Sequence, residues 1–248
     1  YTDDYIGCDT TLSLGYVYNS TTFDEIFFDN YGMAVPAAGY VFLEGPKVDA
    51  DGDGDLDTLG LSSFTYFGSE GDAISDPDKF VYAGTLQWFN LMEGFLPRPE
   101  YPTQLPFVDP LTLTAEKFVL AGDPLTGAGW IDGIVMPPGD RRLVMNTGPF
   151  QMALGDTQDI FVGTIGAIAE DNLTSLGKLI EFTKLARTFH NSGYDNKAIE
   201  LNVAPIITAL NDVTINEDET ATVTLSATDG DGDAITFSVK DNNATRNY

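Results

Sequence analysis

Short apolar runs, separated by Gly, Pro, Asn and Asp, recur along most of the chain. Aromatic and β-branched residues dominate these runs, and runs of this length between turn residues are typical of β-strands. The pattern predicts strands in the ranges 12–18, 40–43, 117–120, 141–145 and 159–165. Between Leu96 and Pro110 the prolines are dense, which predicts a long loop because proline cannot donate to a ladder. The chain is therefore expected to be mainly β.

Two segments carry helix signals instead. In the range 77–93, Asp76-Pro77-Asp78 offers an N-cap and an acidic first turn, and Gly94 is placed to end the helix. In the range 174–190, apolar residues from Leu176 to Phe189 recur at three- and four-residue spacing, Asn172 or Thr174 can cap the start, and 191–193 can end it. The second helix is expected to lay one face on a sheet.

The pattern of residues along the chain changes near residue 198. Residues 1–198 fit a β-sandwich-like main domain with helices near 77–93 and 174–190, whereas 199–248 alternate Thr and Val like the first strands of a second sandwich. A complete sandwich of this kind needs about 100 residues and about seven strands. The segment 206–237 is therefore expected to continue in further sequence, or to pair with a neighbouring domain or a second copy of the chain.

A cluster of carboxylates between residues 49 and 57 is the strongest chemical signal. Its spacing matches the D-x-[DN]-x-[DN]-G pattern of a calcium loop, with Gly54 at the turn and Gly60 where an EF-hand has Glu. The predicted metal ligands are Asp49, Asp51, Asp53, Asp55 and Asp57. The sequence therefore predicts Ca²⁺ bound without the flanking helices of an EF-hand. A solvated acidic turn is the alternative.

A second acidic cluster, Asp229, Asp231 and Asp233, follows a strand-like run near the C-terminus. Asp-Gly pairs between alternating runs are also a strong signal for a hairpin turn. Metal binding and a plain turn therefore both remain open for this segment.

Charge and cysteine content limit the partners and the environment. The 248-residue chain has 43% hydrophobic residues and a formal net charge of −26, so it can bury a core while its surface is strongly acidic. Nucleic acids and anionic membranes need a positive footprint and are excluded as partners, and no apolar run is long enough to insert into a membrane. Cys8 has no disulfide partner in the chain and is expected to be buried. The acidity and the predicted calcium loop favour an extracellular or cell-surface location.

The sequence offers few groups for catalysis. It has one His and one Cys, and no zinc-protease, serine-hydrolase or phosphate-loop motif. His190 is expected to face the C-terminal dipole of its helix, and Trp88 and Trp130 are expected to pack in the core, with exposure of Trp130 as a sugar platform as the alternative. A glycosidase needs only two suitably spaced carboxylates, so that activity stays open.

Two parts of the chain resemble known families. Residues 202–237, with Asn202-Val203-Ala204-Pro205 and the acidic run 229–233, resemble the opening half of a cadherin-like or Ig-like tandem repeat of large bacterial surface proteins. That resemblance implies calcium ligands at Glu217, Asp229, Asp231 and Asp233. The ranges 4–12, 122–130 and 148–158 resemble a module of multidomain proteins exported by type IX secretion, for which no activity is implied. The loop 49–57 departs from that module and resembles the calcium loops of FG-GAP and thrombospondin-type repeats.

The sequence-based hypothesis is a non-catalytic, calcium-stabilised structural module of a secreted or surface-anchored protein, such as a stalk, an adhesin or an extracellular fibre subunit. Its expected partners are neighbouring domains, copies of the same chain and, in one alternative, glycans. A carbohydrate-binding accessory module of a secreted hydrolase, and a carboxylate-based glycosidase, are the two other functions considered.

Overall fold

The computed structural model describes residues 3–49, 51–68, 74–195, 205–209, 213–216, 218–229 and 234–238. Within this part the protein is mainly β, with three helices and several antiparallel sheets. The strands are β1 (Asp4–Asp9), β2 (Leu14–Asn19), β3 (Pro36–Glu44), β4 (Lys47–Val48), β5 (Asp57–Thr58), β6 (Ser63–Phe67), β7 (Phe107–Val108), β8 (Ala115–Glu116), β9 (Arg142–Asn146), β10 (Phe161–Ile168), β11 (Ile206–Ile207) and β12 (Ala227–Thr228). The helices are α1 (Glu25–Tyr31), α2 (Tyr82–Met92) and α3 (Asn172–Asn191). Internal contacts divide the chain into the units Tyr1–Tyr194 and Asp195–Tyr248.

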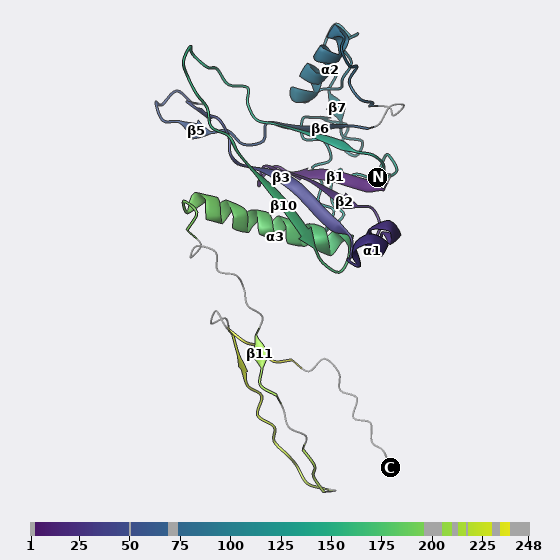
Figure 1. Ribbon diagram of the computed structural model, residues 1–248, viewed down its shortest axis with the longest axis vertical. Coiled ribbons are helices and arrows are strands. Elements are labelled where there is room, and N and C mark those ends of the chain that lie inside the picture. Colours follow the sequence, from purple (N-terminus) through teal and green to yellow (C-terminus); the bar gives the residue numbers. More distant parts are fainter. Residues whose placement is uncertain are drawn as a thin grey trace. The chain divides into compact units, whose positions relative to one another are not determined.

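A four-stranded antiparallel sheet in the order β1-β2-β3-β10 forms the centre of the first unit. The adjacent strands β3 and β10 come from distant parts of the sequence, since Pro36 at the start of β3 pairs with Ile168 at the end of β10. Successive side chains of a strand point to opposite faces of the sheet, so each strand contributes to two different layers. Figure 1 shows this sheet between α3 on one side and the β6 region on the other.

Helix α3 covers one face of the sheet (Figure 1). Its fully buried Leu176 and Leu179 pack against Leu14, Tyr16 and Val41 of the strands. The helix begins with a capping box: the Asp171 carboxylate accepts from the Thr174 N–H at 2.8 Å, and the Thr174 hydroxyl accepts from the Asp171 N–H at 2.9 Å. The sequence-based cap at Asn172 or Thr174 was therefore off by one to three residues, but the expected helix on a sheet is confirmed.

The opposite face of the sheet packs against a second layer made by the β6–β9 pair, α2 and β7. Ile6 and Cys8 of β1 are buried there among Phe64 of β6, Leu91 of α2 and Val119. The expected burial of Cys8 is confirmed, and Trp130 also packs against this core. The second layer leaves part of this face open: Phe42 of β3 packs against it, but Tyr40 of β3 and Val162 of β10 are 50% and 53% exposed.

A buried ion pair joins the loop before β9 to strand β1. The side chains of Arg141 and Asp132 are only 5% and 1% exposed, and Arg141 Nε donates to Asp132 Oδ2 at 3.1 Å. The same carboxylate accepts from the Ile6 N–H at 3.2 Å, and the guanidinium lies over the Tyr66 ring. Both charges are therefore hydrogen-bonded within the interface of the two layers.

Several sequence-based boundaries were wrong. Helix α1 was not predicted; it is a short helix of seven residues capped by Asp24, and none of its residues is buried. Helix α2 starts at Tyr82 rather than near residue 77, because Phe80 has φ of 63° and Asp76 pairs with Arg142 at 2.7 Å instead of capping. Residues 117–120 make one isolated bridge, Phe118 to Phe64, rather than a strand. Gly94, at φ of 87°, follows the end of α2 as expected.

In the second unit, β11 and β12 pair antiparallel, with Ile206 opposite Thr228 and Ile207 opposite Ala227. The Thr208 N–H donates to the Ser226 carbonyl at 2.9 Å and extends this pairing. Ile206 and Ile207 are 70% and 62% exposed. No helix among the described residues has the length and apolarity that crossing a bilayer requires.

Candidate functional site

A projecting β-ribbon carries the predicted calcium loop. Strands β4 and β5 pair antiparallel through Lys47 opposite Thr58 and Val48 opposite Asp57, and the acidic loop lies between them. The Gln158 side chain holds the base of the ribbon: its Oε1 accepts from the Lys47 N–H at 2.8 Å and its Nε2 donates to the Lys47 carbonyl at 3.0 Å. The loop is therefore anchored at its base, and its described residues are exposed.

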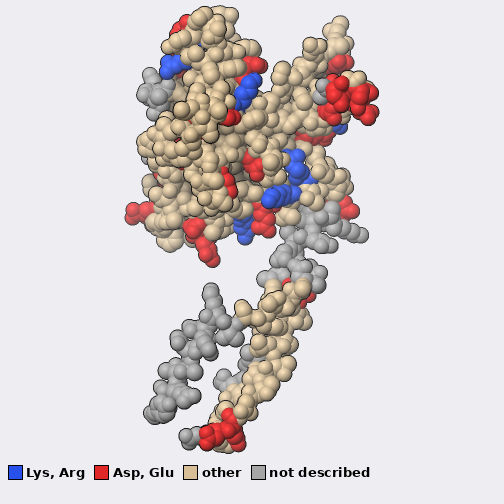
Figure 2. All heavy atoms as spheres, turned by 180° about the vertical axis from the view of Figure 1, so that it is seen from behind, with Lys and Arg blue, Asp and Glu red and all other residues tan. Residues whose placement is uncertain are grey.

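Three of the predicted ligands converge at that end. One carboxylate oxygen from each of Asp49, Asp51 and Asp53 lies within 4.8 Å of the others, and all three residues are exposed. Gly52 and Gly54, with φ of 81° and 93°, allow the tight turns that bring them together. Figure 2 shows the resulting dense group of acidic side chains at the end of the ribbon. Among the described residues this is the one group of three or more His, Cys, Asp or Glu side chains with such spacing.

Backbone N–H groups of the loop organise these carboxylates. Asp49 Oδ1 accepts from the Gly52 N–H at 2.7 Å, Asp51 Oδ1 from the Asp53 N–H at 3.3 Å, and Asp53 Oδ1 from the Asp55 N–H at 2.8 Å. Each carboxylate keeps its other oxygen, and hard oxygen ligands of this kind suit Ca²⁺. The loop thus presents three carboxylates from one face.

The remaining predicted ligands are placed differently. Asp55 and Asp57 are exposed in the same ribbon, with Asp57 at the start of β5, but they lie outside the group of three. Asp229 follows β12 by one position, whereas Glu217, Asp231 and Asp233 lie outside the described residues.

No basic side chain among the described residues forms an ion pair with the acidic loop. The nearest lysine in sequence, Lys47, pairs with Glu44 Oε1 at 2.5 Å, and this contact holds the pKa of Glu44 below its usual value. Glu44 Oε2 lies 3.4 Å from His190 Nε2, and His190 lies in the last turn of α3, the position expected from the sequence. The charge of the loop therefore remains available to a cation from solution.

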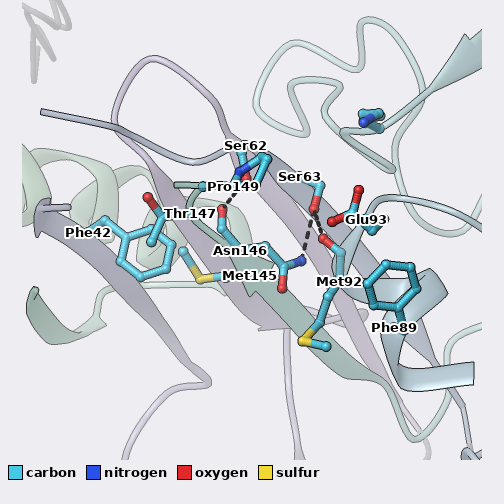
Figure 3. A pocket seen from close by; sticks show the side chains of 12 residues that line it. Phe42, Ser62, Ser63, Phe89, Met92, Glu93, Met145, Asn146, Thr147 and Pro149 are labelled. Carbon is cyan, nitrogen blue, oxygen red and sulfur yellow. Dashed lines mark hydrogen bonds between the residues drawn. The ribbon is translucent and has the colours of Figure 1, made fainter. Parts of the chain in front are cut away.

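A cavity of about 360 Å³ lies on another part of the first unit, between the C-terminal end of α2 and the end of β9. Figure 3 shows Phe89 and Glu93 on one side, Phe42 and Thr147 on the other, and Asn146 between them. Ser63 links the two elements, since its hydroxyl donates to the Met92 carbonyl and accepts from Asn146 Nδ2, each at 2.9 Å. Trp88 is outside this lining; it is 42% exposed and contacts the Phe67 ring edge-on.

Sequence reasoning missed this cavity because its lining comes from β3, β6, α2, Lys117 and the residues around β9. Only the pairing of β6 with β9, and the packing of α2 on both, brings these segments together. The one available signal was Glu93 itself, an acidic residue at the C-terminal end of a predicted helix, where the helix dipole disfavours it.

Comparison with known proteins gives no family: no protein-family description, no curated protein and no solved structure matches this chain.

Proposed function

We propose that the protein is a non-catalytic, calcium-braced structural module of a secreted or surface-anchored protein, with a sandwich-like main domain followed by an Ig-like or cadherin-like repeat. The observation that carries the proposal is the convergence of the Asp49, Asp51 and Asp53 carboxylates within 4.8 Å. Three like charges at this separation repel one another by roughly 1 kcal/mol per pair even in water. A divalent cation converts this repulsion into attraction and orders the ribbon.

The expected affinity fits an extracellular setting. Calcium sites of extracellular modules bind with Kd of about 10⁻⁴ to 10⁻³ M, which free calcium outside cells is sufficient to occupy. With a Kd of about 10⁻⁴ M, 1 mM Ca²⁺ stabilises the folded state by about 1.4 kcal/mol, because only the folded loop brings the ligands together. For a domain of this size that corresponds to an increase in Tm of roughly 3 to 6 °C.

Calorimetric titration and thermal unfolding test this proposal. The wild-type chain should bind Ca²⁺ saturably, and its Tm should be higher in 1 mM Ca²⁺ than in EGTA. In the variant Asp51→Asn/Asp53→Asn, both the heat of binding and the difference in Tm should disappear. Asp29→Asn, an exposed carboxylate of α1, is the matched control and should behave like the wild type. An equal Tm with and without Ca²⁺ in the wild type would refute the brace.

The second unit supports a role in assembly. Its described strands expose Ile206 and Ile207 and leave a two-stranded sheet with open edges, which favours pairing with a neighbouring domain or a second copy. Analytical sizing at several protein concentrations, on the full chain and on a chain ending at residue 194, separates these cases. Self-assembly should be concentration-dependent and should be lost with the second unit.

A further inference from the structure

The cavity beside α2 carries chemistry that bracing does not use. The Glu93 carboxylate lines the cavity and has no hydrogen-bond or ion-pair partner among the described residues. It also occupies the C-cap position of α2, where the partial negative charge of the helix end disfavours an anion. A carboxylate in this position costs stability, so a binding role accounts for it better than a structural one.

The rest of the lining is amphipathic. Phe89 is 50% exposed and presents an aromatic ring to the cavity, and Phe42 and Pro149 add apolar surface on the other side. The floor is polar, because Asn146 donates to Ser63 through Nδ2 and has no other side-chain partner in the described part of the chain. A carboxylate, an amide oxygen and a flat apolar ring thus converge on one space.

We propose that this cavity binds a neutral saccharide unit. A sugar ring has a C–H face that can lie on Phe89, and hydroxyl groups at its edge that can donate to Glu93 and to Asn146. The volume of about 360 Å³ is at the small end of ligand cavities, which suits one sugar unit rather than a peptide or a large cofactor. Lys117 also lines the cavity, with its Nζ over the Phe95 ring, so Glu93 offsets the one positive charge there, and the net charge of −26 disfavours anionic sugars.

Saturation-transfer NMR followed by calorimetric titration of the full chain tests the proposal. The probes are cellotetraose, mannotetraose and chitotetraose, with tetragalacturonate as the anionic comparison. At least one neutral tetrasaccharide should bind saturably, and tetragalacturonate should not. Absence of saturable binding by all three neutral probes, or binding of the anionic probe alone, overturns the proposal.

Two variants locate the binding. Phe89→Ala should weaken it about 3- to 10-fold through loss of the ring contact. Glu93→Gln should weaken it about tenfold, because a hydrogen bond to a charged acceptor is roughly twice as strong as a neutral one. Its Tm without ligand should stay equal or rise, whereas a purely structural Glu93 would lower it.

Matched controls keep the result specific. Phe80→Ala removes a fully exposed ring that does not line the cavity, and Glu100→Gln neutralises an exposed carboxylate 57% accessible beyond the end of α2. Both should bind as the wild type does. Wild-type affinity in Phe89→Ala and Glu93→Gln together would place any saccharide site elsewhere and overturn the assignment to this cavity.

Discussion

Replacing Asp132 by Asn removes one charge of the buried pair while keeping its shape and an acceptor for the Ile6 N–H. Arg141, only 5% exposed, is then left without its counter-charge. Breaking a buried pair on one side costs about 3 to 5 kcal/mol, because the remaining charge stays desolvated. At about 2 to 4 °C per kcal/mol for a domain of this size, the Tm should fall by roughly 6 to 20 °C.

Thermal unfolding followed by near-ultraviolet circular dichroism in 1 mM Ca²⁺ measures this change. The matched control is Asp140→Asn, which breaks the shorter contact of 2.6 Å to Arg142 between side chains 36% and 40% exposed. Exposed pairs contribute about 0 to 1 kcal/mol, so this control should move the Tm by only a few degrees. If Asp132→Asn loses no more stability than Asp140→Asn, burial does not decide the strength of these pairs and the reasoning is refuted. Asp132→Asn/Arg141→Met should recover part of the loss.

Three further results are expected. Burial raises the pKa of Cys8 to about 12, so the native thiol should resist alkylation at pH 8 and react once the protein is unfolded in denaturant. An unfolded thiol ionises near pH 9.0, so the stabilisation from this burial is complete below that pH and should be lost as the pH rises toward 12. The free energy of unfolding of Cys8→Ala should decline less over the same pH range. Hydrogen bonds from Thr174 hold the pKa of Asp171 below its usual value of 3.8, so its stabilisation should be present above about pH 4 and lost as the pH falls further, and the loss of stability in acid should be smaller in Asp171→Asn.

The parts of the fold that sequence predicted are those in which local pattern and packing agree. Apolar residues from Leu176 to Phe189 recur at three- and four-residue spacing, and Leu176 and Leu179 are fully buried against the sheet, so α3 was found almost at its full length. Helix α1 could not be found in this way, because its apolar Ile26 and Phe28 remain 75% and 47% exposed and match no core. The apolar run at residues 117–120 predicted a strand. Val119 and Leu120 are indeed buried, but this segment enters the core without forming a strand.

The candidate sites likewise differ in whether they depend on local sequence or on long-range pairing. The loop at Asp49, Asp51 and Asp53 is local, so residue spacing and glycine positions were enough to predict that these carboxylates meet. The cavity at Glu93 and Asn146 depends on the pairing of β6 with β9, and local sequence carries no information about such long-range pairing. Sequence therefore predicted the loop, whereas for the cavity it offered only the position of Glu93 at a helix end.

The pairing of β3 with β10 has a consequence for the order in which the chain is made. Every element from β4 to β9 leaves the ribosome before β10 does, so the nascent β3 keeps an open hydrogen-bonding edge throughout that interval. Leu14 and Val41 likewise stay uncovered until α3 emerges. The central sheet is thus completed only late in synthesis. A truncation that stops before α3 would leave an aggregation-prone intermediate rather than a smaller stable protein.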